Sequence, residues 1–235
     1  MKKIFFGLLA FVSLSTQAQT ADEVIQKYAK AMGGLDNFNK VKTAKMSGTV
    51  SAQGMDLPVT IQIINGKAMR SDVEVMGQSV TTSYKDGKGW KINPFAGAAT
   101  ATDATAPELS DMKTQSSLAS QLMDYKARGC KVELQGQEDV SGAKAYKIKL
   151  TEADNKETTY YVDATSFMAV KVVGKRNLMG QDMEIETYLN DPKEFGGVKF
   201  NTAIVQKSGG QTFQEIHFDK VELNVPVDEK IFDKQ

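Results

Sequence analysis

The chain has 235 residues, with 29 basic and 29 acidic side chains and a formal net charge of zero. Such a balance argues against nucleic acid as a partner, because binding to a phosphate backbone needs a basic surface that displaces counterions. The single histidine, His217, and the single cysteine, Cys130, leave too few ligands for a typical zinc site.

The N-terminus has the features of a cleaved signal peptide. Two lysines follow Met1, the apolar run "IFFGLLAFVSL" comes next, and Thr16-Gln17-Ala18 places small residues before a cleavage after Ala18. The apolar run is too short to span a bilayer. Residues 1–18 are therefore predicted to be a signal peptide, with a retained anchor helix as the alternative, and residues 19–235 are predicted to form a single domain.

The mature chain is predicted to begin with two helices. Thr20 and Glu23 have the spacing of a capping box, and the apolar residues that follow lie on one helical face as far as Met32. Gly33-Gly34 ends this helix. A short second helical turn is expected around Leu35, Phe38 and Val41. The apolar face of the first helix consists of Val24, Ile25, Tyr28, Ala29 and Met32.

From Thr43 the apolar period changes to two, which is typical of strands that are apolar on one face. Glycine and asparagine turn signals separate the strands, for example Asn65-Gly66 and Gly196-Gly197. The pattern predicts roughly ten antiparallel strands and an α+β, mainly β, fold. Because such a sheet must cover its apolar face, helices are expected to pack against it.

The segment "YKDGKGWKINPF", residues 84–95, combines glycines, lysines and the only tryptophan, Trp90. A phosphate-binding loop would need the spacing GxxxxGK[ST] between a strand and a helix, which is absent here. A hairpin with Asp86-Gly87 at its turn accounts for the same residues. Trp90 and Ile92 then share one strand face, and Asn93-Pro94 ends the strand.

Residues 96–106, "AGAATATDATA", have the composition of a flexible tether. A helix from Pro107 to Tyr125 should follow, with an apolar stripe formed by Leu118, Leu122 and Tyr125. A helix on such a tether could open as a lid, and a helix fixed over one end of the sheet is the alternative.

Catalytic and metal-binding signals are weak. His217 shares a strand face with Glu215 and Asp219, so a hydrolase would have to use it with an unrecognised nucleophile. We expect His217 instead to face solvent in a charged row. The acidic segments lack calcium-loop spacing, and no metal or cofactor is expected. Cys130 is either a small buried apolar residue or an unpaired thiol.

Several segments resemble the LolA-like family of outer-membrane lipoprotein-sorting proteins. They are "ADEVIQKYAKAMGGLDNFNKVKTAKMSGTV", "YKDGKGWKINPF", "TYYVDATSFMAVKVVGK", "GVKFNTAIVQ" and "VELNVPVDEKIF". The resemblance implies an incomplete antiparallel β-barrel of about ten to eleven strands, with helices covering an apolar concave face. It also implies a non-enzymatic periplasmic carrier for lipoprotein acyl chains or related lipids, with an inner-membrane ABC exporter as donor and an outer-membrane acceptor. A non-catalytic envelope sensor or assembly module that binds a protein partner is the second hypothesis.

Strand alternation supplies the candidate site. Methionine is an adaptable side chain that suits a pocket whose ligand varies in shape. The candidate lid residues are Leu118, Leu122 and Tyr125. The candidate cavity residues are Ile61, Ile63, Met69, Val73, Val75, Trp90, Ile92, Ile148, Met168, Val170, Met183, Ile185 and Phe200.

Overall fold

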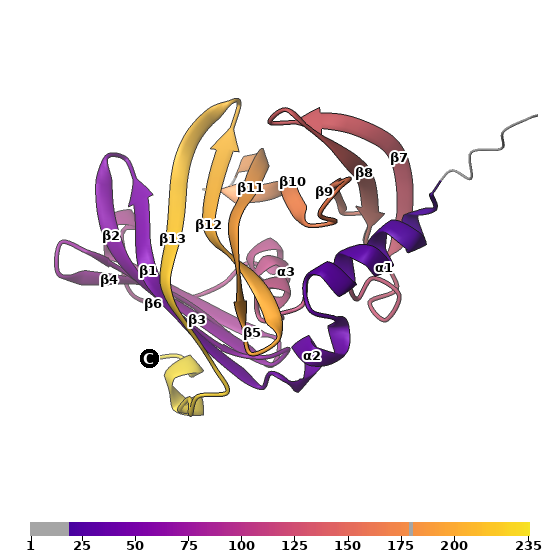
Figure 1. Cartoon of the computed structure of the whole chain (residues 1–235). Helices are drawn as coiled ribbons and strands as arrows, with labels where there is room; N and C mark the ends of the chain where they lie inside the picture. The colour runs from indigo at the N-terminus through magenta and orange to yellow at the C-terminus, as the bar shows by residue number, and fades with distance from the viewer. Residues whose placement is uncertain (1–18, 179–180) are drawn as a thin grey trace, which may run out of the picture.

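The computed structural model describes residues 19–178 and 181–235, so the predicted signal peptide at 1–18 lies outside the described residues. The described chain forms one antiparallel sheet of thirteen strands with three α-helices (Figure 1). The helices are α1 (Ala21–Ala31), α2 (Leu35–Lys40) and α3 (Ala106–Gln115), and two short 3₁₀ turns are η1 (Pro94–Ala96) and η2 (Glu229–Phe232). The strands are β1 (Thr43–Ala52), β2 (Met55–Ile64), β3 (Ala68–Val75), β4 (Gln78–Lys85), β5 (Lys88–Asn93), β6 (Ala98–Asp103), β7 (Lys131–Val140), β8 (Ala143–Thr151), β9 (Glu157–Asp163), β10 (Ala169–Leu178), β11 (Gln181–Phe195), β12 (Val198–Ser208) and β13 (Gln211–Leu223).

The sheet consists of two meanders joined at one seam. Its order is β6-β5-β4-β3-β2-β1-β13-β12-β11-β10-β9-β8-β7, so β1 pairs with the last strand and every other neighbour is consecutive in sequence. The end strands β6 and β7 do not pair with each other in the described chain, which leaves an incomplete barrel. Figure 1 shows the sheet curling around α3, with α1 and α2 along its lower right side. The predicted fold class is confirmed, and thirteen strands replace the expected ten to eleven.

The two N-terminal helices form where the sequence predicts them. The amide of Glu23 donates to Thr20 Oγ1 at 3.3 Å, and Thr20 N donates to Glu23 Oε2 at 3.1 Å, which completes the capping box. Val24, Ile25 and Tyr28 on α1 are buried, as is Phe38 on α2. No helix within the described ranges is long and apolar enough to cross a membrane.

The prediction of a flexible tether at residues 96–106 is wrong. Ala98–Asp103 forms β6, which pairs with β5 at the end of the sheet. The threonines at positions 100 and 102 favour extended backbone, and pairing with β5 satisfies backbone groups that a tether would leave to water.

The predicted helix from Pro107 to Tyr125 is also wrong in its second half. α3 ends at Gln115, and residues 116–130 form turns. The hairpin turn between β2 and β3 supplies the competing hydrogen bonds: Gly66 N donates to Ser116 O at 2.8 Å, and Leu118 N donates to Asn65 Oδ1 at 3.0 Å. Asn65 Nδ2 also donates to Phe38 O and Val41 O, so one side chain connects α2, the start of β1 and the segment after α3.

The β1–β13 seam generates a stability prediction at Gly48, beside the β-bulge. A Cβ atom on Gly48 would lie 1.9 Å from the backbone oxygen of His217, whereas one on Gly174 in β10 would meet its nearest neighbour, Thr158 Oγ1, at 3.5 Å. Gly48→Ala should therefore lower the free energy of unfolding by about 1–3 kcal/mol or more. Gly174→Ala, the matched control, should change it by less than about 0.5 kcal/mol. Urea denaturation measures both, and equal effects would contradict the close contact at the seam.

Candidate functional site

The concave face of the sheet is apolar along its length, and its buried residues form two clusters. Phe200, Leu118 and Leu223 are partly buried against both clusters and so connect them. The first cluster contains Ala44, Met46, Val50, Val59, Ile63, Met69, Tyr84, Met112 and Phe218. The second contains residues of α1, α2 and the 116–130 segment together with Ile148, Leu150, Tyr160, Val162, Met168, Ala169 and Val198.

The interior of the second cluster is filled by protein, and a cleft of about 340 Å³ lies at its edge between α1 and residues 123–127. Leu122 is fully buried in it, and Tyr28 Oη donates a hydrogen bond to Ser120 Oγ at 3.0 Å. Burial raises the pKa of Tyr28 and of Tyr160 above the ordinary phenol value. Tyr125 and Lys126 both bind Asp22 at the start of α1, which fixes the 116–130 segment against that helix. This half of the barrel is a packed core.

α3 covers the first cluster through the side chains of Met112 and Leu109 and through two ion pairs. Met112 is buried, and Met112 and Leu109 approach β5 closely at Gly89, where a Cβ would lie within 2.8 Å of either side chain. Two ion pairs anchor the helix, one between Glu108 and Lys91 on β5 and one between Asp111 and Lys156 in the β8–β9 turn, with 2.5 Å between Asp111 Oδ1 and Lys156 Nζ. Both pairs are partly exposed, so each contributes about 1 kcal/mol or less.

The hydrogen bonds of Glu108 stabilise α3 in its observed position. Burial raises the pKa of this carboxyl, but hydrogen bonds from Lys91 and Thr105 outweigh burial and hold the pKa below its ordinary value. The ionised Glu108 therefore stabilises the folded protein at neutral pH, and this contribution is lost as the pH falls through the lowered pKa of Glu108.

Two cavities adjoin α3. The larger, about 730 Å³, lies between the start of α3, the β8–β9 turn and the adjoining parts of β10 and β11, with polar residues such as Asp154, Lys175 and Glu184 in its lining. The smaller, about 120 Å³, shares Asp111, Lys156, Gly174 and Lys175 with it and reaches Tyr160, Val172 and Ile185. The larger volume falls in the range of small-molecule sites, about 300–1,000 Å³, and the smaller one lies below it.

The structure places most predicted cavity residues on or beside the concave face. Ile185 lines the smaller cavity, Val75 is half-buried on the same side of β3 as Val73, and Met183 is 37% exposed at the beginning of β11. Val170 falls at a bulge in β10. The lid candidates Leu118, Leu122 and Tyr125 lie in the second cluster or pack against it rather than on α3. The residues within the two clusters or packed against them are Ile61, Ile63, Met69, Val73, Ile148, Met168 and Phe200.

Trp90 and Ile92 lie on the face of β5 opposite to the one predicted. The hairpin is as predicted, with Asp86 and Gly87 both at positive φ, but Gly89 is the β5 residue that faces α3. Trp90 and Ile92 therefore point to the opposite, convex face, and the prediction that they line the cavity is wrong. Period-two alternation places them together but does not say on which side.

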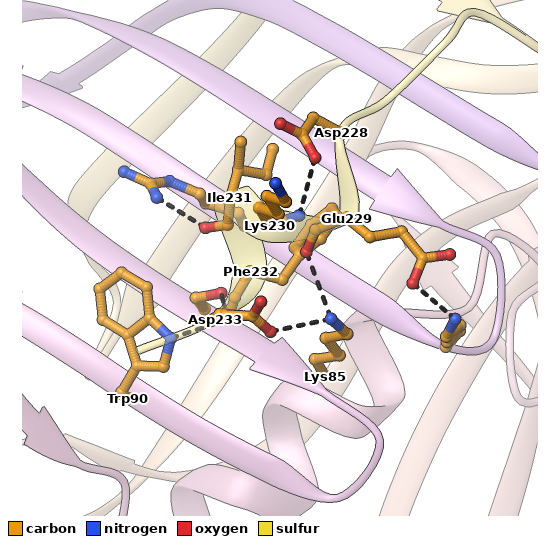
Figure 2. Close-up of polar contacts among 11 residues, drawn as sticks. Lys85, Trp90, Asp228, Glu229, Lys230, Ile231, Phe232 and Asp233 are labelled. Atoms are coloured by element: carbon orange, nitrogen blue, oxygen red, sulfur yellow. Dashed lines mark hydrogen bonds and ion pairs between the residues drawn. The ribbon is translucent and has the colours of Figure 1, made fainter. Parts of the chain in front are cut away.

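The C-terminal segment covers Trp90 (Figure 2). Phe232 is 1% exposed, and its carbonyl accepts hydrogen bonds from Trp90 Nε1 at 2.8 Å and from Ser83 Oγ at 3.2 Å. Arg70 Nη1 donates to Ile231 O at 2.7 Å, and Lys85 Nζ lies 2.8 Å from Asp233 Oδ1. We call residues 228–233 with these partners the C-terminal clasp. The sequence motif "DEKIFD" gave one usable signal for it, an apolar pair in a charged segment.

His217 and Cys130 lie outside the two cavities beside α3. His217 is exposed on the convex side of β13, with Nε2 3.6 Å from Asp219 Oδ1, as expected for a charged row. Cys130 is half-buried beside the second cluster, and burial raises the pKa of its thiol. Among residues 19–178 and 181–235, no three His, Cys, Asp or Glu side chains gather as metal ligands would.

Comparison with known proteins shows the fold. No protein-family model and no curated protein sequence matches this chain. Among solved structures, a LolA superfamily protein from Nitrosomonas europaea aligns with a TM-score of 0.60 and 12% identity, over 92% of this chain and 99% of that one. A DUF1329 family protein from Desulfovibrio piger gives 0.61 and 10%, over 92% and 98%. A domain named for outer membrane lipoprotein sorting, from Vibrio parahaemolyticus, gives 0.61 and 9%, over 91% and 96%.

These likenesses, spanning nearly the whole of each chain, define the class of structure. The protein has the LolA-like fold: an incomplete antiparallel barrel with helices against its concave face. At 9–12% identity they show the fold alone.

The position of Trp90 makes its fluorescence a reporter of the clasp and not of the cavity. The Trp90 side chain is 3% exposed in the wild-type protein. Phe232→Ala should let water reach the indole and so shift the Trp90 emission to longer wavelength. Lys230→Ala, an exposed neighbour, should leave the emission unchanged. A brominated fatty acid, which quenches tryptophan only at short range, should not quench wild-type Trp90. Quenching on ligand binding would place Trp90 beside the ligand and contradict the assignment.

Proposed function

We propose that this protein is a periplasmic carrier that binds the acyl chains of lipoproteins or related lipids beneath α3 and takes part in outer-membrane lipoprotein sorting. The observation that carries the proposal is the difference between the two groups of elements that lie on the concave face. α1, α2 and the 116–130 segment pack several buried side chains against one half of the concave face, whereas α3 covers the other half with one buried side chain, Met112, and two partly exposed ion pairs.

The energetics favour a shielded site. At about 0.8 kcal/mol for each buried CH₂ group, an acyl chain of ~16 carbons represents roughly 13 kcal/mol of unfavourable exposure to water. The smaller cavity is too small for such a chain while α3 is closed. A chain would enter through the larger cavity and occupy the apolar face as α3 moves outward, and the weak attachment of α3 keeps that movement inexpensive.

The remaining parts of the proposal come from the sequence and from the structural relatives. The signal peptide predicted at residues 1–18 would direct the chain to the periplasm. The Vibrio parahaemolyticus domain is named for outer membrane lipoprotein sorting, which supports the same process here. An inner-membrane ABC exporter as donor and an outer-membrane acceptor are the partners that such a carrier needs. We propose no catalytic role, since His217 lies on the convex face, outside both cavities.

A non-catalytic envelope sensor or assembly module is the second candidate. The observation that favours it is the packed state of the second cluster, because a filled barrel can present its surface to a protein partner without holding a lipid.

Cross-linking α3 in place tests the carrier function. In a Cys130→Ala background, Asp111→Cys and Lys156→Cys are joined by a short bismaleimide linker that contains a cleavable disulfide. We expect the uptake of a fluorescent fatty-acid probe to slow by at least about tenfold and to recover after reduction.

The matched control joins the exposed ion pair of the β7–β8 hairpin, Asp139→Cys with Lys144→Cys, which lies away from α3. This cross-link should leave probe uptake unchanged. Equal uptake with and without the α3 cross-link would reject α3 as the cover, and no probe binding before cross-linking would reject the carrier function in favour of the second candidate.

A further inference from the structure

The turns of the sheet fall on two rims, because strand direction alternates along it. We call rim A the rim that holds the β1–β2, β3–β4, β5–β6, β8–β9 and β12–β13 turns, together with the end of β10 and the beginning of β11. Rim B holds the β2–β3, β4–β5, β7–β8, β9–β10 and β11–β12 turns.

The large apolar side chains that are exposed in the described residues all lie at rim A. Met76, 83% exposed, forms the β3–β4 turn with Gly77, and Phe95, 54% exposed, lies in the 3₁₀ turn between β5 and β6. Met55 begins β2 at 36% exposure, and Met183 near the beginning of β11 is 37% exposed. We call these four residues the apolar tips. In Figure 1 the β1–β2 hairpin points upward at the left of the molecule and the turn beside β4 points to the left, both away from α1 and α2.

The turns around the apolar tips on β1–β6 contain no charged residue, and Asp56 and Glu74 lie on the adjoining strands. The connecting residues at rim A that carry or adjoin the tips on β1–β6 are uncharged: Gln53-Gly54, Met76-Gly77 and Pro94 to Gly97. Uncharged turns lower the cost of leaving water for a hydrocarbon environment.

One of the four tips, Met183, adjoins the larger cavity. Met183 stands between Asp182 and Glu184, and both of these residues line that cavity, as do Lys175 and the β8–β9 turn residues 154–156. A surface that receives Met183 therefore lies close to the entrance through which a lipid would reach the space beneath α3.

We infer that rim A docks on the surface of a lipid bilayer, with the apolar tips inserted among the outer parts of the acyl chains. The inference deepens the proposed carrier function, since it assigns the surface from which lipid enters. The tips are single side chains on separate hairpins and not a continuous patch, which suits a fluid surface better than the close-packed core of a protein interface. Charges beside Met183 are mixed, with Lys175 and Arg176 near Asp182 and Glu184, so docking depends on apolar insertion and little on anionic lipid.

Co-sedimentation with phosphatidylcholine vesicles tests the inference. Wild type should sediment with the vesicles, and Met76→Asn combined with Phe95→Ser should lower the partition coefficient at least about tenfold. Asparagine is suited to the positive φ of 48° at position 76. Adding phosphatidylglycerol should change the wild-type partition little.

Ser141→Met provides the matched control, because Ser141 forms the β7–β8 turn on rim B with a similar φ of 51°. Added to the double variant, it should not restore vesicle binding. Three outcomes would overturn the inference. The wild type could remain in the supernatant, the double variant could sediment like wild type, or Ser141→Met could restore vesicle binding. So would dissociation of a wild-type dimer by the double variant, since the tips would then bind a second copy.

Binding of the fatty-acid probe in vesicle-free buffer separates the two proposals. The double variant should bind the probe like wild type, because neither substituted residue lines a cavity. Normal probe binding without vesicle docking would reject rim A docking alone. Vesicle docking without probe binding would reject the carrier function and leave the docking surface in place.

Discussion

The pairing of β1 with β13 is the interaction on which the rest of the structure depends. It joins the first strand of the sheet to the last, and without it the two meanders would share no backbone hydrogen bonds. The backbones approach so closely at the bulge that Gly48 has no room for a side chain. Beyond the seam, Lys42 N donates to Asn224 Oδ1 at 2.8 Å, and the chain continues to the C-terminal clasp on the convex side of β3, β4 and β5. The final segment therefore holds the first meander in its curve from outside.

The residues buried on the concave face form two clusters with different helices against them. α1, α2 and the 116–130 segment complete a packed core over β7–β10, where a substitution would act on stability. α3 instead meets the other half through Met112, Leu109 and two partly exposed ion pairs. A packed core beside a helix that buries one side chain, Met112, suits the proposed reversible shielding of an acyl chain, because the ligand must be both held and released.

Local signals predicted much of this architecture, and non-local contacts account for the errors. The capping box at Thr20, the Asp86-Gly87 hairpin and the period-two strands depend on neighbouring residues, and each formed as expected. The helix predicted to reach Tyr125 ends at Gln115 because Asn65 and Gly66, about fifty residues earlier, take the hydrogen-bonding groups at Ser116 and Leu118. Trp90 faces the convex side because the distant Phe232 covers it there. Alternation identified which residues share a face, but choosing the concave face needed the position of α3.

Acyl-lipid binding can be measured by mass spectrometry of the protein purified from periplasm without detergent, in its native state and after organic extraction. The account predicts a population with bound mass equal to an acyl lipid, which is released into the organic phase and leaves apo protein able to bind a fluorescent fatty acid. Protein that carries no lipid and fails to bind the fatty acid would contradict it.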